Sequence, residues 1–210
     1  MQIVQIATGE IRANAFLAFE DASKQAFVVD PGADFNKIMA HIDHYGIEEV
    51  THILLTHGHW DHIGAVAALK EATGAKVCIH ERDLKMLSSA TASMAAFVGG
   101  TLVPCEADIV LKGGETIRAA GMDVQVLHTP GHSGGSVCYL CGDVMFSGDT
   151  LFYMYCGRTD FPGSDAVEYE HSLNTVLRGL QKDYQVYTGH GIKTTLFAEF
   201  RQNPFFSRTV

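Results

Sequence analysis

The feature that most constrains this chain is a dense histidine cluster directly after a short apolar run. Residues 53–55 are Ile-Leu-Leu, and residues 56–62 are Thr-His-Gly-His-Trp-Asp-His. In an extended strand end, side chains two positions apart project to the same side, so His57 and His59 can bind one ion together. Where the chain turns into a helix, Asp61 and His62 can reach a neighbouring position. The motif predicts a metal-binding loop between a strand and a helix; the alternative is an N-cap aspartate among surface histidines.

Three later residues stand in similar local settings. His132 follows a Pro-Gly pair, Asp149 follows Ser-Gly, and His190 lies between two glycines. Each comes just past a strand-like run, where glycine lets the backbone crowd a metal and loops can converge on one sheet edge. Alone, each would be an ordinary turn residue. Together with residues 56–62, they predict one shared metal centre.

Hydrophobic patterning predicts a single domain over residues 1–210, with two packed sheets covered by outer helices. The chain is 47% hydrophobic and 19% charged, which suits a well-filled core. Apolar stripes predict helices around residues 38–45, 63–70 and 173–180, and composition predicts another over 81–97. The predicted strands are residues 3–6, 15–19, 26–29, 52–56, 76–79, 122–127, 136–140, 144–147 and 185–188.

Charge and apolar run length restrict partners and location. The formal net charge of −9 opposes binding to nucleic acid. No apolar run approaches the roughly 20 residues of a membrane span, and the first twenty residues do not resemble a signal peptide. Five cysteines cannot all pair within one chain, which fits a compartment that keeps thiols reduced. These observations predict a cytoplasmic protein that associates with neither nucleic acid nor membrane.

The motifs resemble those of the metallo-β-lactamase superfamily, in order and across most of the chain. The resemblance implies an α+β fold, a four-layer αββα sandwich with the metals at one edge. It implies that a first ion binds His57, His59 and His132. A second ion would bind Asp61, His62 and His190, and Asp149 would bridge the two.

Among members, the chain is most similar to short glyoxalase II-like hydrolases. The similarity rests on Asp30-Pro31-Gly32, on Gly-Arg-Thr-Asp-Phe-Pro at residues 157–162, and on the Gly-His-Gly around His190. Ile192 stands where such proteins usually carry proline. We also expect no C-terminal helical substrate domain of the kind with which full-length glyoxalase II enzymes grip glutathione. The resemblance implies hydrolysis of small thioesters, with a glutathione conjugate as the candidate substrate.

The residues allow a mechanism to be predicted. Two divalent ions would hold a bridging hydroxide, since metal-bound water has a pKa of about 7. Zinc is the first expectation for these ions, with iron or manganese as alternatives. Asp61 would orient that hydroxide as the catalytic residue. A thiol with a pKa of about 8.5 can leave as the thiolate without a dedicated general acid. Arg158 is the predicted contact for a substrate carboxylate, and Tyr153 and Tyr155 are predicted to line the pocket.

Other functions share parts of this pattern. A mononuclear iron persulfide dioxygenase, also similar in sequence around residues 156–161, would use His57, His132 and Asp149 as a two-histidine, one-carboxylate site. Lactonases and β-lactamases share the two-metal chemistry. A binding protein with a purely structural metal is the third class, but structural zinc sites are usually closed tetrahedra with four ligands.

Overall fold

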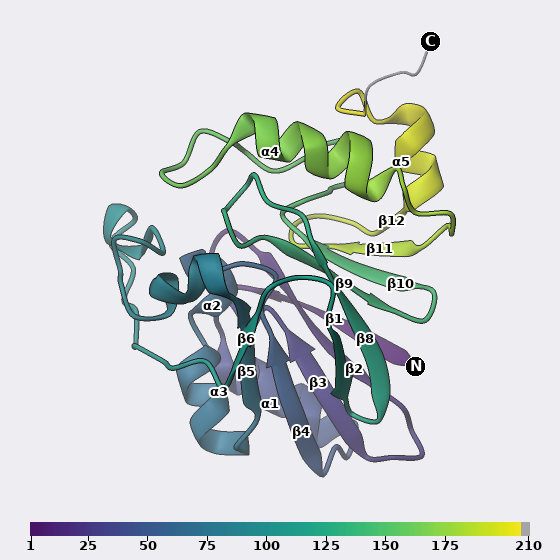
Figure 1. Ribbon diagram of the computed structural model, residues 1–210. Coiled ribbons are helices and arrows are strands. Elements are labelled where there is room, and N and C mark those ends of the chain that lie inside the picture. Colours follow the sequence, from purple (N-terminus) through teal and green to yellow (C-terminus); the bar gives the residue numbers. More distant parts are fainter. Residues whose placement is uncertain (207–210) are drawn as a thin grey trace.

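Two six-stranded sheets pack face to face in the computed structural model, which describes residues 1–206 (Figure 1). The first sheet runs in chain order through β1 (Gln2–Thr8), β2 (Ala13–Phe19), β3 (Gln25–Val29), β4 (Glu49–Leu54), β5 (Lys76–His80) and β6 (Ile109–Leu111). The second has the spatial order β12, β11, β10, β9, β8, β7. Its strands are β7 (Thr116–Ala119), β8 (Met122–His128), β9 (Val137–Cys141), β10 (Val144–Gly148), β11 (Gln185–Thr188) and β12 (Thr194–Thr195).

Strand direction brings the chemistry to one edge. In the first sheet β3, β4, β5 and β6 are parallel, and in the second sheet β10 and β11 are parallel. The carboxyl ends of parallel strands lie at the same sheet edge, and the loops that follow them converge there. The loops after β4, β10 and β11 carry the histidine cluster, Asp149 and His190.

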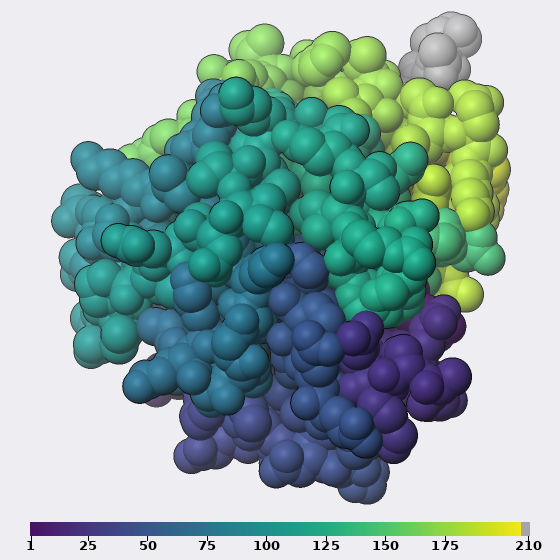
Figure 2. All heavy atoms as spheres, turned by 60° about the horizontal axis from the view of Figure 1, so that its bottom comes forward, coloured from purple at the N-terminus to yellow at the C-terminus, as the bar shows by residue number. Residues whose placement is uncertain are grey.

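Helices form the two outer layers (Figure 1). The helices α1 (Phe35–His44) and α3 (Val66–Thr73) belong to the first half of the chain, and α2 (Trp60–Ile63) is a single turn beside the histidine cluster. On the second sheet, α4 (Ala166–His171) continues into a π-helical turn, η3 (Ser172–Leu177), and α5 (Leu196–Gln202) lies near β12. In the space-filling view, the N-terminal half occupies the lower part of the visible face and C-terminal residues the opposite rim (Figure 2).

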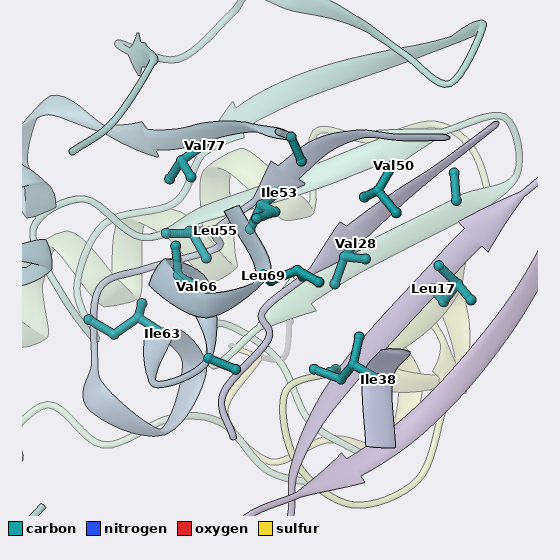
Figure 3. Packing of buried hydrophobic residues seen from close by; sticks show 14 of the residues in the cluster. Leu17, Val28, Ile38, Val50, Ile53, Leu55, Ile63, Val66, Leu69 and Val77 are labelled. Atoms are coloured by element: carbon teal, nitrogen blue, oxygen red, sulfur yellow. The ribbon is translucent and has the colours of Figure 1, made fainter. Parts of the chain in front are cut away.

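Three apolar clusters lie between these four layers. Alternate residues of β2 divide between the first two, because successive side chains of a strand point to opposite faces. Leu17 joins the cluster beneath α1 and α3, where it lies near Ile38 (Figure 3), while Phe16 packs between the sheets. The third cluster includes Leu140 of β9 and Leu173 of η3. The predicted αββα sandwich is therefore confirmed.

The predicted elements match the structure unevenly. All nine predicted strands are present, eight with shifted ends and β11 with the predicted bounds, whereas β6, β7, β12, α4 and α5 were not predicted. The helix predicted around residues 173–180 coincides in part with η3. The helix predicted over residues 81–97 is wrong: this stretch forms two 3₁₀ segments, η1 (Glu81–Leu87) and η2 (Ala95–Phe97). Met94 has a left-handed φ of 71°, and the Ser93 carbonyl accepts a hydrogen bond from the Trp60 amide. Tertiary hydrogen bonds thus replace helical ones.

Two further features bear on the sequence predictions. None of the helices within residues 1–206 combines the length and apolar character that a membrane crossing requires. The five cysteines, all within the described part of the chain, are free thiols.

Candidate metal centre

All seven predicted ligands meet at the sheet edge, although they come from both halves of the chain. The His57 ring lies 4.9 Å from the His132 ring, and the His62 ring lies 5.3 Å from the His190 ring, between centroids. Asp61 Oδ2 is 3.2 Å from His190 Nε2. The side chains that were predicted from separate strand ends therefore form one cluster.

The first group consists of His57, His59 and His132, all buried. Their ligand atoms lie within 4.8 Å of one another. His59 Nδ1 and His132 Nε2 are 2.9 Å apart. Three imidazole nitrogens converging on one point, with the surrounding protein leaving a side open, form the ligand set of a catalytic zinc-type ion.

The second group consists of Asp61, His62 and His190, whose ligand atoms also lie within 4.8 Å of one another. It is more open, since the His190 side chain is 27% exposed. Asp149 lies between the two groups. Its Oδ1 is 3.4 Å from His62 Nε2, and its Oδ2 is 3.5 Å from His132 Nε2. This position is the one that the predicted bridging role requires.

Hydrogen bonds fix which nitrogen of each ring faces the centre. His132 Nδ1 donates to the Arg158 carbonyl at 2.8 Å. His57 Nδ1 lies 3.1 Å from Thr56 Oγ1, whose hydroxyl itself donates to Asp30 Oδ2 at 2.6 Å. With Nδ1 used as the donor, Nε2 of His57 and of His132 keeps a free lone pair, as metal ligation demands. In His59 it is Nδ1 that faces His132 Nε2.

Several buried polar atoms at the centre make no hydrogen bond to any residue in the described part of the chain. They are the Nε2 atoms of His57, His59 and His62 and Oδ1 of Asp149. Buried polar atoms are nearly always satisfied, and exceptions call for an unseen partner. Unsatisfied imidazole and carboxylate atoms gathered in one buried place fit cations as partners. The residues present thus suit the metal pair that the sequence predicts.

The electrostatics point the same way. Burial, with the neighbouring histidines, lowers the pKa of His57 well below its ordinary value and that of His59 to about 3, so both rings are neutral. Burial by itself lowers the pKa of His62, but the carboxylates of Asp61 and Asp149 outweigh this effect and raise that pKa. Neutral His57 and His59 leave lone pairs for a cation, and the carboxylates that raise the pKa of His62 supply the negative charge that would attract one.

Two buried aspartates that the sequence predictions did not assign to the site support it. Asp30 accepts hydrogen bonds from the Thr56 amide at 2.8 Å and from His62 Nδ1 at 3.1 Å. Its oxygens are therefore occupied, and it acts behind the ligands although it lies close enough to be one. The Asp30-Pro31-Gly32 motif at a strand end was the signal for it.

Asp83 of η1 is the second supporting carboxylate and is fully buried. Oδ1 accepts from the Gly135 amide at 2.8 Å, and Oδ2 accepts from the Gly58 amide at 3.1 Å and the Ser133 hydroxyl at 2.5 Å. It thereby joins the loop of His57 and His59 to the loop of His132. Nothing in the local sequence of residues 81–87 marks this role.

The predicted substrate contacts lie at different distances from the centre. Tyr155 and Arg158 line a cavity of about 490 Å³ above the metal ligands. Tyr153 lines a shallower neighbouring depression with Phe152 and His190. Arg158 forms a two-pronged ion pair with Asp160, at 2.8 and 2.7 Å. The sequence predictions missed the apolar walls of the cavity, which come from loops distant in sequence.

Glycines keep the centre compact. A Cβ at Gly189 would collide with the Asp149 carboxylate, which explains why glycine precedes His190. Gly148, before Asp149, has a left-handed φ of 48°, and a Cβ there would collide with Thr56. Gly189 is thus a close approach of backbone to a predicted ligand, and Gly148 a close approach to Thr56.

A two-sheet sandwich with five histidines and two aspartates at its edge defines a class of metal-dependent hydrolases. The chain matches the sequence profile of the Metallo-beta-lactamase superfamily over residues 8–190, and it belongs to that superfamily. It is 32% identical to the hydroxyacylglutathione hydrolase GloC of Haemophilus influenzae (strain ATCC 51907 / DSM 11121 / KW20 / Rd) over 99% of both chains.

Solved structures agree with the family assignment. BLEG-1, a B3 metallo-beta-lactamase, is similar to this chain with a TM-score of 0.91 and 34% identity, over 98% of this chain and 100% of that one. TTHA1623, solved in a di-iron-bound form, has a TM-score of 0.82 and 38% identity over 97% and 100% of the two chains. Proteins that are about equally similar to this chain thus carry different names. Family membership therefore indicates a metallo-hydrolase, but it identifies neither the substrate nor the metal.

Proposed function

We propose that the protein hydrolyses small thioesters, and that the two ligand groups, with Asp149 between them, would hold two divalent cations for this reaction. The observation that carries the proposal is a set of buried atoms that lack a hydrogen-bond partner among the described residues, namely Nε2 of His57 and His62 and Oδ1 of Asp149. The likeness to GloC over nearly the whole of both chains supports thioesters as the substrate class. Zinc is the metal we propose first, with iron and manganese as alternatives.

The chain's own residues divide the work. A bound pair of divalent cations lowers the pKa of water and polarises a carbonyl oxygen. Asp61 is the ligand we assign to orienting the attacking water, because it lines the cavity and its Oδ2 lies near His190. Buried, neutral His57 and His59 keep the first position free of competing protons.

The leaving group needs little help from the protein. Attack by water forms a carbon–oxygen bond and breaks the carbon–sulfur bond, giving a carboxylic acid and a thiol. A thiol with a pKa of about 8.5 can leave as the thiolate at neutral pH. Among the described residues that line the cavity there is neither a lysine nor a glutamate to serve as a general acid. The lining therefore suits a thioester better than an amide, whose leaving amine must be protonated.

Substrate contacts and location complete the proposal. Tyr155, Tyr153 and Arg158 are the proposed contacts, and Arg158 would meet a substrate carboxylate by exchanging its partner Asp160. A glutathione thioester is the first candidate substrate, and we propose neither nucleic acid nor membrane as a partner. Five free thiols support a cytoplasmic location.

The test is thiol release from S-lactoylglutathione by the metal-replete protein, with elemental analysis of the same sample. We expect close to two metal ions per chain and activity that disappears on dialysis against a chelator and returns with zinc. The control is the dialysed protein supplied with magnesium, a cation that prefers oxygen ligands. One iron per chain with oxygen uptake on glutathione persulfide would overturn the proposal in favour of the dioxygenase, which would leave His59 without a role.

A further inference from the structure

The cavity above the metal ligands has walls of one chemical kind. Apart from the ligands, it is lined mainly by apolar and aromatic side chains from four separate loops. These side chains are Ile11, Trp60, Met94, Val98, Phe152 and Phe161. The volume of about 490 Å³ is within the range of small-molecule sites.

Two of the apolar side chains that line the cavity are exposed to solvent. Ile11, on the turn between β1 and β2, is 52% exposed, and Val98, just after η2, is 55% exposed. Exposed apolar groups gathered around the mouth of one cavity mark a surface that takes up an apolar ligand. The Val98 segment is held at the site, since the Ser93 carbonyl accepts from the Trp60 amide at 2.9 Å.

Charge complementarity separates the candidate substrates. Glutathione carries two carboxylates at neutral pH, and binding them in a cavity requires cations. Within the described lining, the one cationic side chain apart from the metal-ligand histidines is Arg158. Its guanidinium is already paired with Asp160 at 2.7 Å and lies over the Phe161 ring at 4.5 Å. The cavity thus offers much apolar area and a single cation, which has to leave Asp160 before it can bind one of the two carboxylates.

We infer that this cavity binds the apolar acyl chain of the thioester, so that the preferred substrates carry a medium-length alkyl group next to the reacting carbonyl. The inference rests on the proposed function and deepens it. The acyl side is the occupant because common thiol carriers, such as glutathione and coenzyme A, are polar. The apolar part of such a thioester is its acyl group.

One test is a chain-length series of thioesters of N-acetylcysteamine, a small neutral thiol, from acetyl through butyryl and hexanoyl to octanoyl. We expect kcat/KM of the metal-replete enzyme to rise by up to about fourfold per methylene until the cavity is full. Hexanoyl thioester should then exceed S-lactoylglutathione. A flat or falling series would overturn the inference.

A matched pair of variants locates the effect. Val98→Lys places a cation at the cavity wall and should flatten the chain-length series while raising activity on S-lactoylglutathione. Val103→Lys is the control, because Val103 is 59% exposed and does not line the cavity. Equal effects of the two variants would contradict the assignment of the acyl chain to this wall.

A binding measurement keeps this inference separate from the proposed reaction. Methyl ketones from 2-butanone to 2-octanone mimic the substrate carbonyl but cannot be hydrolysed. The chain's one tryptophan, Trp60, lines the cavity, so its fluorescence reports their binding. Chain-length-dependent affinity without hydrolysis of any thioester would refute the proposed reaction and support the apolar cavity. Affinity independent of chain length would refute the cavity's role.

Discussion

The two metal-ligand groups differ in burial and in how the protein holds them. The first, His57, His59 and His132, is built of buried imidazoles on loops from both sheets. The second contains the carboxylate of Asp61 and the partly exposed ring of His190. A buried, three-histidine position holds its ion on a rigid ligand set, whereas a half-open position with a carboxylate exchanges its ion more readily. The comparison predicts unequal affinity of the two sites.

The two supporting carboxylates, Asp83 and Asp30, also differ in what they contact. Asp83 stands behind the first group and contacts no ligand ring, since its partners are two backbone amides and a serine hydroxyl. Asp30 contacts the His62 ring directly and reaches His57 only through Thr56. One carboxylate therefore fixes loops and the other fixes a ring, which makes their roles separable by mutation.

The largest effect is expected for His132→Ala. The change removes the one ligand that the second sheet contributes to the first group, and with it several kcal/mol of charge stabilisation. We expect kcat/KM to fall by about 10³-fold and metal content to fall to about one ion per chain. Excess zinc should not restore activity, because no other side chain can replace the lost nitrogen. His171→Ala, at an exposed position on α4, is the control and should retain both ions.

His190→Ala should have a smaller and partly reversible effect. The second group keeps Asp61 and His62, with Asp149 at 3.4 Å from His62, and water can occupy the exposed position that His190 leaves. We expect a loss of about 10²-fold in kcat/KM at limiting zinc, recovered in large part at high zinc. A titration of activity with zinc measures it. Equal resistance of both variants to rescue would show that the two sites do not differ as the burial suggests.

Asp30→Asn tests the ring contact. An amide nitrogen in place of Oδ2 faces two donors, His62 Nδ1 and the Thr56 hydroxyl. In place of Oδ1 it faces the Thr56 amide, which pushes the side chain away from the His62 ring. Loss of a hydrogen bond to a metal-ligating imidazole costs about 10-fold to 100-fold in metal affinity. Competition with a chromophoric chelator should show weakening at the second site before the first. Asp123→Asn, at an exposed strand position, is the matched control.

The ligands were predictable because their signals are local. An H-x-H-x-D-H spacing after an apolar strand, and glycines around Asp149 and His190, reflect chain geometry over a few residues. The four layers were predictable from strand and helix patterning for the same reason. Short edge strands such as β6 and β7, of three and four residues, leave too few positions for a pattern.

The remaining features depend on contacts between distant parts of the chain. Asp83 meets Gly58 across 25 positions and Gly135 across 52, so no local pattern reveals it. The contribution of Arg158 to His132 comes from its backbone carbonyl, which the residue type does not indicate. The acyl cavity joins Ile11, Val98 and Phe161, which lie far apart in the sequence. Residue identity predicts ligands, but only the fold shows what supports and encloses them.

The smallest effect on activity is expected for Asp83→Asn, because Asp83 acts on the first group through loop backbone. The asparagine oxygen can accept the hydrogen bonds that Oδ2 of Asp83 accepts. The asparagine NH2 group then faces the Gly135 amide, which is also a donor. We expect this loss to lower the free energy of unfolding by about 1–3 kcal/mol. We expect zinc affinity at the first site to fall by about tenfold with little change at the second. Ser133→Ala removes one of the three donors and should give a smaller shift in the same direction.

The site at which Asp83→Asn weakens binding decides what the two carboxylates do. Chelator competition on this variant should reverse the order found for Asp30→Asn, with the first site now weakening before the second. Destabilised unfolding with both zinc affinities unchanged would mean that Asp83 only holds the fold together. Equal weakening at both sites would mean that the two groups are mechanically one unit. The distinction between them would then rest on burial alone.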